Sequence, residues 1–272
     1  MNSAQKVVYW QAHRGGGIHD APDNTMAASR YAWNLGGIPE FDIRTTKDGV
    51  IVCLHDETLS RTSTANQAIR DVPIRQLTFD DVRYWDVGVK FDAKFEGEKV
   101  PSLEEVFIEM EGKPQRKAYL DLKDVDLNQL AILIDKYKVN KQIIFTHNVQ
   151  NNCISMKGIA AGVTTMLWIG GSPDQIKEKF SKAVGSSFVG LDQVQLHLNS
   201  TESVNQWPYQ LDKEYLQYAL TETKRYGIDL EVFPFAFDSN SIHELLNIGI
   251  RWFATDAPRK FIDAVQLWQE KR

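Results

Sequence analysis

Three carboxylates in this sequence directly follow or interrupt short apolar runs. Glu40 and Asp42 lie on either side of a phenylalanine, and Asp121 follows a leucine. On an extended strand, residues two apart point to the same side, so Glu40 and Asp42 share a face. Burying like charges together is costly unless a cation compensates them. An all-oxygen set of this kind suits Mg²⁺ or Ca²⁺ better than zinc. We therefore predict a divalent cation site; the alternative is separate ion pairs with nearby Arg or Lys side chains.

Two histidines end apolar runs in the same half of the chain. His13 closes the first run, and His55 closes another shortly after the carboxylates. Histidine titrates near neutral pH and both accepts and donates protons, so a pair beside a cation site predicts acid/base catalysis. Arg14 and Lys123 add fixed positive charge of the kind that holds phosphate oxygens. His147 is a reserve candidate because it also follows a strand-like run.

The segment Pro22-Asp23-Asn24-Thr25 precedes a helical pattern. Asp, Asn and Thr side chains accept hydrogen bonds from the free amides of a helix start, which predicts an N-cap. The alternative is that one of these polar side chains supports the site. The residues alone leave both interpretations open.

The elements that position these residues alternate between strand and helix. Short apolar runs are followed by amphipathic stretches, the pattern of a parallel sheet, and eight such units close naturally into a barrel. Polar residues at the carboxyl ends of the strands then lie together, where such barrels carry their active sites. The predicted strands are 6–12, 38–43, 117–122, 142–146, 163–168, 188–191, 228–233 and 251–254. The predicted helices include 24–35, 127–138, 174–183, 213–226 and 239–248.

One apolar run, 50–54, comes too soon after the second strand for a parallel crossover. Asp48-Gly49 is a hairpin signal, so residues 42–55 are predicted to form an antiparallel arm. Such an arm returns His55 to the level of Asp42. Segment 56–101 has no clean periodicity and is predicted to form a small excursion over one side of the barrel mouth.

Composition limits the remaining possibilities. The 272 residues are 43% hydrophobic and 25% charged with a net charge of −5, which predicts one globular domain spanning 1–272. The negative charge argues against nucleic acid or an anionic membrane as an obligatory partner.

Cys53 and Cys153 are predicted to be free thiols. Residues 1–5 lack the pattern of a secretory signal. This favours a cytoplasmic protein, or a secreted or periplasmic one if a leader was removed; the oligomeric state stays open.

The chemistry-bearing residues belong to an ordered set of motifs that resembles glycerophosphodiester phosphodiesterases. In chain order, the motifs are His13-Arg14-Gly15, Pro22-Asp23-Asn24-Thr25, Glu40-Phe41-Asp42, Thr46-Lys47-Asp48-Gly49, His55-Asp56, Leu59-Ser60-Arg61-Thr62, the stretch 95–105, Leu120-Asp121-Leu122-Lys123 and Thr255-Asp256-Ala257-Pro258. The resemblance implies a (β/α)8 TIM barrel with a small inserted subdomain after the second strand, matching 56–101. It also implies hydrolysis of small-molecule glycerophosphodiesters to sn-glycerol 3-phosphate and an alcohol, with Ca²⁺ or Mg²⁺.

By matching position, the resemblance implies individual roles. The acid/base pair would be His13 and His55, the phosphate-binding residues Arg14 and Lys123, and the metal ligands Glu40, Asp42 and Asp121. Three positions depart from the family pattern. Asp23 stands where the family usually has Glu, Asp121 is one methylene shorter than the usual Glu, and Phe233-Pro234-Phe235 replaces a Trp-Thr pair. The last departure leaves open both the leaving alcohol and whether glycerol is required, with Trp168, Phe233 and Phe235 as candidate pocket residues.

Two alternatives accompany this interpretation. Related barrels act on lipids, as phospholipase D-like or phospholipase C-like enzymes do, and the aromatic residues could line a lipid-accepting mouth. A non-catalytic protein that binds phosphate esters is the other alternative. The presence of both histidines and all three carboxylates argues against it.

Overall fold

A computed structural model describes residues 7–201 and 207–271 of the chain. Lys6, the first residue of the first predicted strand, lies outside these ranges, as do residues 1–5, on which the localisation expectation rests. Within the described ranges, no helix combines the length and the apolar composition needed to cross a membrane.

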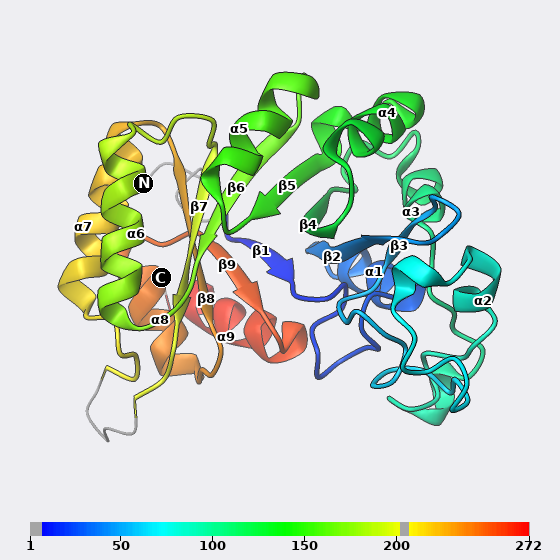
Figure 1. Ribbon diagram of the computed structural model, residues 1–272. Helices are drawn as coiled ribbons and strands as arrows, with labels where there is room; N and C mark the ends of the chain where they lie inside the picture. Colours follow the sequence, from blue (N-terminus) through cyan, green and yellow to red (C-terminus); the bar gives the residue numbers. More distant parts are fainter. Residues whose placement is uncertain (1–6, 202–206, 272) are drawn as a thin grey trace.

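Eight parallel strands close into a barrel (Figure 1). They are β1 (Tyr9–Ala12), β2 (Ile38–Thr45), β4 (Ala118–Asp124), β5 (Ile143–His147), β6 (Thr164–Ile169), β7 (Gln193–Leu198), β8 (Asp229–Pro234) and β9 (Trp252–Thr255). Closure is shown by β1, which pairs in parallel with β9 on one side and with β2 on the other. The predicted (β/α)8 TIM barrel is confirmed.

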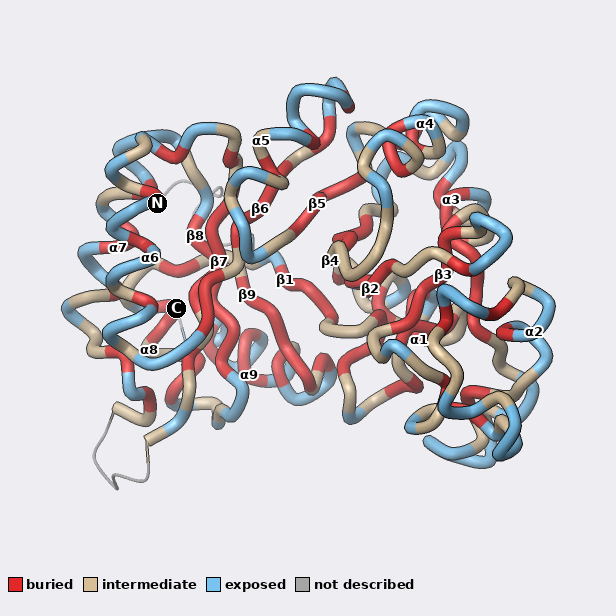
Figure 2. Tube along the Cα trace, in the orientation of Figure 1, coloured by how far each residue is buried: buried red, intermediate tan, exposed pale blue. Residues whose placement is uncertain are grey.

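Helices cover the outside of the barrel. They are α1 (Met26–Asn34), α3 (Leu103–Met110), α4 (Leu127–Tyr137), α5 (Gln150–Ile159), α6 (Pro173–Gly185), α7 (Lys213–Arg225), α8 (Ser239–Ile248) and α9 (Pro258–Glu270). Figure 2 shows their outer faces exposed and the strands buried. In α6, Ser172 caps the start, and Ile176, Phe180 and Ala183 form the buried stripe that amphipathic spacing requires.

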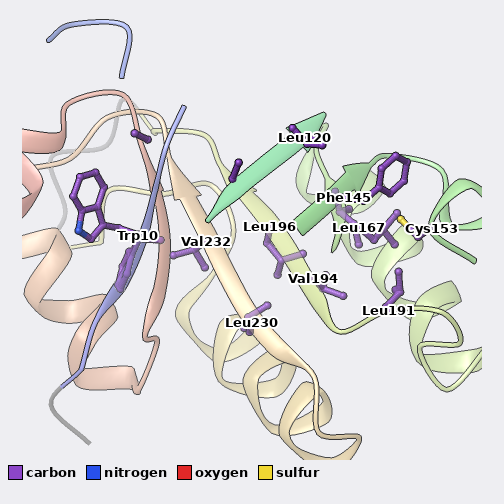
Figure 3. Close-up of a cluster of buried hydrophobic side chains, with 14 of the residues drawn as sticks. Trp10, Leu120, Phe145, Cys153, Leu167, Leu191, Val194, Leu196, Leu230 and Val232 are labelled. Carbon is purple, nitrogen blue, oxygen red and sulfur yellow. The ribbon is translucent and has the colours of Figure 1, made fainter. Parts of the chain in front are cut away.

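The main apolar core lies between the strands and these helices. Figure 3 shows part of it, with side chains from β1, β4, β5, β6, β7 and β8 and from the outer layer. Leu120, Phe145 and Val194 are completely buried there. Each has a polar neighbour on its strand that faces the other way, so the alternation of side chains divides an apolar outer core from a polar barrel interior.

The predicted strand 188–191 is wrong; the seventh barrel strand is β7, a few residues later. The apolar run after α6 packs as a loop in which Phe188 has a positive φ of 53° and is nonetheless buried. In β7, Val194 and Leu196 join the outer core, whereas Gln195 lies with the polar groups of the interior. Because one face of this strand is polar, its sequence is not an uninterrupted apolar run, although its period-two pattern indicates a strand.

The antiparallel arm after β2 is confirmed. Strand β3 (Ile51–Cys53) pairs antiparallel with β2, with Ile43 opposite Cys53. The turn contains Gly49 at a φ of 84°, a conformation that glycine adopts without strain. The Leu54 amide donates to the Asp42 carbonyl at 2.8 Å, so the residue after it, His55, returns to the level of the carboxylates.

Residues 56–101 carry only short elements. They include 3-10 helices at Ile74–Gln76 and Ala93–Phe95 and the helix α2 (Phe79–Arg83). An apolar cluster separate from the main core holds them to the β3 arm: Val52, Leu54, Leu59, Ile74, Leu77, Val82, Val87 and Val100. The segment thereby presents its own polar residues beside the carboxyl ends of β1 and β2, where Arg61 reaches Asp23.

A fully buried carboxyl group lies in the barrel interior. Glu231 accepts hydrogen bonds from the Tyr119 hydroxyl at 2.9 Å and from the Gln193 and Gln195 amides at 3.1 and 2.5 Å. These donors are all uncharged. Burial therefore raises the pKa of Glu231 from 4.5 to about 7, although the hydrogen bonds favour the ionised form.

This burial predicts a pH-dependent stability difference for Glu231→Gln. Between pH 4.5 and 7, Glu231 ionises in the unfolded chain but stays protonated in the folded chain. Rising pH therefore lowers the free energy of unfolding of the native protein, by roughly 3 kcal/mol over this range. Glutamine does not titrate, so the free energy of unfolding of the variant does not fall for this reason. We expect its stability relative to the native protein to increase from pH 4.5 to 7.5 in urea unfolding. A difference that does not change with pH would contradict the raised pKa.

Candidate active site

The predicted site residues converge on one cavity of about 170 Å³ at the carboxyl ends of the strands. Every one of them lines it except Arg14: His13, Glu40, Asp42, His55, Asp121, Lys123, Trp168, Phe233 and Phe235. The side chains come from β1, β2, β4, β6, β8 and the β3 arm. The strand ends of a closed barrel meet at one mouth, which is why residues far apart in sequence lie together.

The three carboxylates form a compact buried group. Asp42 lies opposite Asp121 in the parallel register of β2 and β4, and Glu40 is two residues before Asp42 on the same face. One oxygen from each residue lies within 4.8 Å of the others. Burial, together with the charges of Asp42 and Asp121, raises the pKa of Glu40 well above its usual range. This hard-oxygen donor set fits a divalent cation such as Ca²⁺ or Mg²⁺.

Lys123 partly compensates the carboxylates. Its ammonium lies 2.6 Å from Asp121 and 3.1 Å from Asp42. Burial opposes ionisation of Asp42, but Lys123 and His55 outweigh this effect and lower its pKa, whereas burial raises the pKa of Asp121. The ion-pair alternative is thus realised for Lys123. One ammonium does not compensate all three acidic groups, however: the raised pKa values of Glu40 and Asp121 show that their charged forms are disfavoured in the fold without a cation, and a divalent cation would favour them.

Each of the two histidines has a carboxylate at Nδ1. His13 Nδ1 lies 2.6 Å from Asp256, and His55 Nδ1 lies 2.8 Å from Asp56. A carboxylate only accepts hydrogen bonds, so the proton is assigned to Nδ1 in both rings and Nε2 is left for a substrate. Arg61 Nε donates to Asp56 at 2.5 Å and holds it in place.

The backbone amide of Arg14 bonds to the carboxylate group, and Arg14 lines a neighbouring pocket. Its amide donates to Glu40 Oε2 at 2.7 Å, in a left-handed conformation with φ of 54°. Its guanidinium donates to Asp23 at 3.0 Å, and Asp23 also accepts from Arg61 at 2.8 Å. These residues line the adjoining pocket. The structure therefore does not bring the Arg14 side chain into the cavity, and phosphate binding by this residue stays a prediction.

Both interpretations of the segment 22–25 hold, for different residues. Thr25 is the N-cap of α1, and its hydroxyl accepts from the Ala28 amide at 3.2 Å. Asn24 supports the site: its Nδ2 donates to the Asp42 carboxylate and its Oδ1 accepts from the Asp42 amide, both at 2.9 Å. Asn24 is buried, so these two bonds fix the orientation of the Asp42 side chain.

Asn24→Ala is therefore expected to weaken cation binding. Loss of a group that orients a metal ligand typically costs 10- to 100-fold in affinity or activity. The measurement is the cation concentration that half-saturates a thermal shift or an activity. The control is Thr25→Ala, which removes the helix cap at about 1 kcal/mol of stability but leaves Asp42 held. Equal cation affinity in the two variants would contradict the role of Asn24.

Several residues in or next to the cavity were not predicted from the sequence. Asp256, which follows β9 and holds His13, was noted only as part of a motif, although the strand-end rule applied to it equally. Gln195 and His197 were missed because the seventh strand was misplaced. His147, the reserve candidate, does not line the cavity; its Nδ1 accepts from the Val149 amide at 2.9 Å, and Thr146 beside it faces the cavity.

The model of the Glycerophosphoryl diester phosphodiesterase family matches residues 13–260, nearly the whole chain. The chain belongs to this family. Its matched range begins at His13 and includes the hairpin arm, the carboxylates and Asp256, so the geometry described above is that of a family member.

Individual curated relatives match this chain over shorter stretches than the family model does. The glycerophosphodiester phosphodiesterase of Caldanaerobacter subterraneus subsp. tengcongensis is 43% identical over 98 residues, 35% of this chain and 37% of that protein. Glycerophosphodiester phosphodiesterase 1 of Mus musculus is 41% identical over 101 residues, 36% of this chain and 29% of that protein. The chain thus spans about a third of the length of the curated relatives it matches.

Solved structures resemble the chain along its whole length. A putative glycerophosphoryl diester phosphodiesterase from Silicibacter pomeroyi has a TM-score of 0.76 at 18% identity and covers 97% of this chain and 95% of its own. A phosphodiesterase from Oleispira antarctica, solved with the product sn-glycerol-3-phosphate, has a TM-score of 0.72 at 19% identity and covers 96% of this chain and 97% of its own. At these identities the likeness shows the fold.

Proposed function

We propose that this protein hydrolyses glycerophosphodiesters to sn-glycerol 3-phosphate and an alcohol, with a divalent cation and two catalytic histidines. The observation that carries this proposal is the shared cavity. It contains the three-carboxylate group and two histidines, each with its Nδ1 engaged by a carboxylate. Family membership and the product complex of the Oleispira antarctica neighbour support the choice of substrate.

Glu40, Asp42 and Asp121 would hold Ca²⁺ or Mg²⁺, which supplies charge stabilisation for the phosphodiester when bound. Lys123 adds a fixed ammonium in the same cavity. One histidine removes the proton of the attacking hydroxyl, either water or the glycerol 2-hydroxyl, and the other donates a proton to the leaving alkoxide. With the Nδ1 proton bound by Asp256 or Asp56, each ring exchanges its proton through Nε2. If the 2-hydroxyl attacks, a cyclic phosphate forms and is hydrolysed in a second step.

The test is release of glycerol 3-phosphate from a panel of glycerophosphodiesters, with Mg²⁺, with Ca²⁺ and with a chelator. We expect release that the chelator abolishes and that one of the two cations restores. Lysophospholipids belong in the same panel, because Trp168, Phe233 and Phe235 do line the cavity. No release from any water-soluble ester with any cation would reject the proposed substrate.

A further inference from the structure

Four aromatic rings line one part of the cavity, and we call Trp168, His197, Phe233 and Phe235 the aromatic box. Trp168 and His197 lie parallel, with an interplanar angle of 2° and centroids 5.2 Å apart. Phe233 and Phe235 meet His197 edge-on, at 88° and 86° with centroids 5.6 and 5.1 Å away. Two parallel rings with two rings perpendicular to them present π faces in more than one direction.

His197 is uncharged in this arrangement. The Gln195 amide nitrogen donates to Glu231 at 2.5 Å and to Gln11 at 3.3 Å, so its carbonyl oxygen is the acceptor that faces His197 Nε2 at 3.1 Å. This assigns the proton to Nε2. Burial, with the charges of His13 and Lys179, lowers the pKa of His197 to about 4. The ring is therefore a neutral aromatic face at neutral pH and does not repel a cation.

The box has few hydrogen-bonding groups left for a ligand. Trp168 Nε1 donates to Asp121 at 3.3 Å, and Nε2 of His197 is engaged by Gln195. The two phenylalanines have no polar atoms. A leaving group with hydroxyls or a primary ammonium would lose hydrogen bonds to water here without replacing them, which is costly. A quaternary ammonium has no N–H to satisfy and is attracted to aromatic faces.

The box adjoins the reacting groups on two sides. Trp168 contacts the Asp121 carboxylate, and the Phe233 ring lies 5.0 Å from the ring of His13. One of the two alcohol groups of a phosphodiester bound at the carboxylates would therefore enter the box, and glycerol, which has two free hydroxyls to satisfy, is the less suited of the two. Among the residues that the structure describes, Lys123 is the one Lys or Arg side chain lining the cavity, and it is paired with Asp121 and Asp42.

Resting on the proposed function, we propose that the aromatic box binds the quaternary ammonium of a choline-type leaving alcohol, so that the preferred substrate is a glycerophosphodiester of choline. Phe233 and Phe235, two residues apart at the end of β8, complete the box in this chain. An apolar pocket without this preference is the competing explanation.

The experiment compares three glycerol 3-phosphate esters on the cation-loaded enzyme: choline, ethanolamine and 3,3-dimethylbutanol, the neutral carbon isostere of choline. We expect kcat/KM for the choline ester to exceed that for the isostere by about five- to thirtyfold, the range of a desolvated cation–π contact. The ethanolamine ester should be slower than the choline ester. Equal kcat/KM for choline and its isostere would reduce the box to an apolar pocket and overturn the inference.

Phe235→Leu keeps an apolar side chain and removes one π face at a rim position that is 41% exposed. We expect it to reduce the ratio of kcat/KM for the choline ester to kcat/KM for the isostere, whatever its effect on the two rates separately. Phe91→Leu is the matched control, because Phe91 is 37% exposed and lies outside the cavity. Its choline preference should equal that of the native enzyme; an equal reduction in both variants would overturn the assignment.

Calorimetric titration with choline and with 3,3-dimethylbutanol separates this inference from the proposed function, because it needs no turnover. Tighter binding of choline, lost in Phe235→Leu, supports the box even if none of the esters is hydrolysed. Equal binding, or no binding of choline, rejects the box even if glycerol 3-phosphate is released from other esters.

Discussion

Replacing His13 or His55 by alanine is expected to lower kcat by about 10²- to 10⁴-fold, the usual contribution of a positioned acid or base. Each imidazole is held by a carboxylate at Nδ1 and lines the cavity through its other edge. Both side chains are partly exposed, at 24% and 34%, so their removal leaves no large cavity in the core. The measurement is steady-state hydrolysis of a glycerophosphodiester at saturating cation, with thermal unfolding of each variant alongside.

His147→Ala is the matched control for this pair. His147 also stands at the carboxyl end of a barrel strand, yet its ring bonds to the Val149 amide and does not line the cavity. Its replacement should change kcat by less than about threefold, within the effect of small structural adjustments. Loss of activity in His147→Ala as large as in His13→Ala would mean that position at the strand ends, rather than proton transfer, explains the effect.

The site was predictable from the sequence where strand parity and strand ends act together. Glu40, Asp42 and Asp121 follow apolar runs long enough to identify their strands, and the period of two fixes which way the side chains point. The hairpin arm was predictable for a similar reason, because the short interval between β2 and β3 excludes a parallel crossover. The sequence alone therefore predicts His55 beside Asp42, and the hydrogen bond from the Leu54 amide to the Asp42 carbonyl agrees with this level.

Two of the site residues that were not predicted from the sequence lie on a strand with a polar face toward the barrel interior. Gln195 and His197 lie on a strand whose alternate residues face a polar interior, so it lacks the apolar run that identifies most parallel strands. The tertiary contacts that favour this strand, above all the hydrogen bonds to Glu231, involve residues far along the chain. The direction of the Arg14 side chain could not be predicted for another reason. Whether a guanidinium points to a phosphate or to Asp23 depends on a side-chain rotation that strand parity does not determine.

Glu40→Gln is expected to abolish the response to cation while leaving the fold intact. The substitution removes one of three buried carboxylates and keeps the size and the acceptor oxygen that the Arg14 amide requires. Loss of a direct ligand should weaken cation affinity at least about 100-fold, because loss of a residue that merely orients a ligand already costs 10- to 100-fold. Activity at a cation concentration that saturates the native enzyme should fall accordingly.

Without cation, the same variant should be at least as stable as the native protein. Asp42 and Asp121 raise the pKa of Glu40 by repulsion on top of its burial, so neutralising this residue relieves an unfavourable interaction in the cation-free fold. Added Ca²⁺ or Mg²⁺ should raise the unfolding temperature of the native protein by mass action and leave that of Glu40→Gln unchanged.

Glu231→Gln is the control. Glu231 is also a buried glutamate of the barrel interior, but it is hydrogen-bonded to Tyr119 and two glutamines and does not belong to the carboxylate group. We expect the control to keep the cation response, so that a response lost only in Glu40→Gln separates ligation from the general effect of replacing a buried glutamate. A full thermal shift in Glu40→Gln would instead place the cation elsewhere.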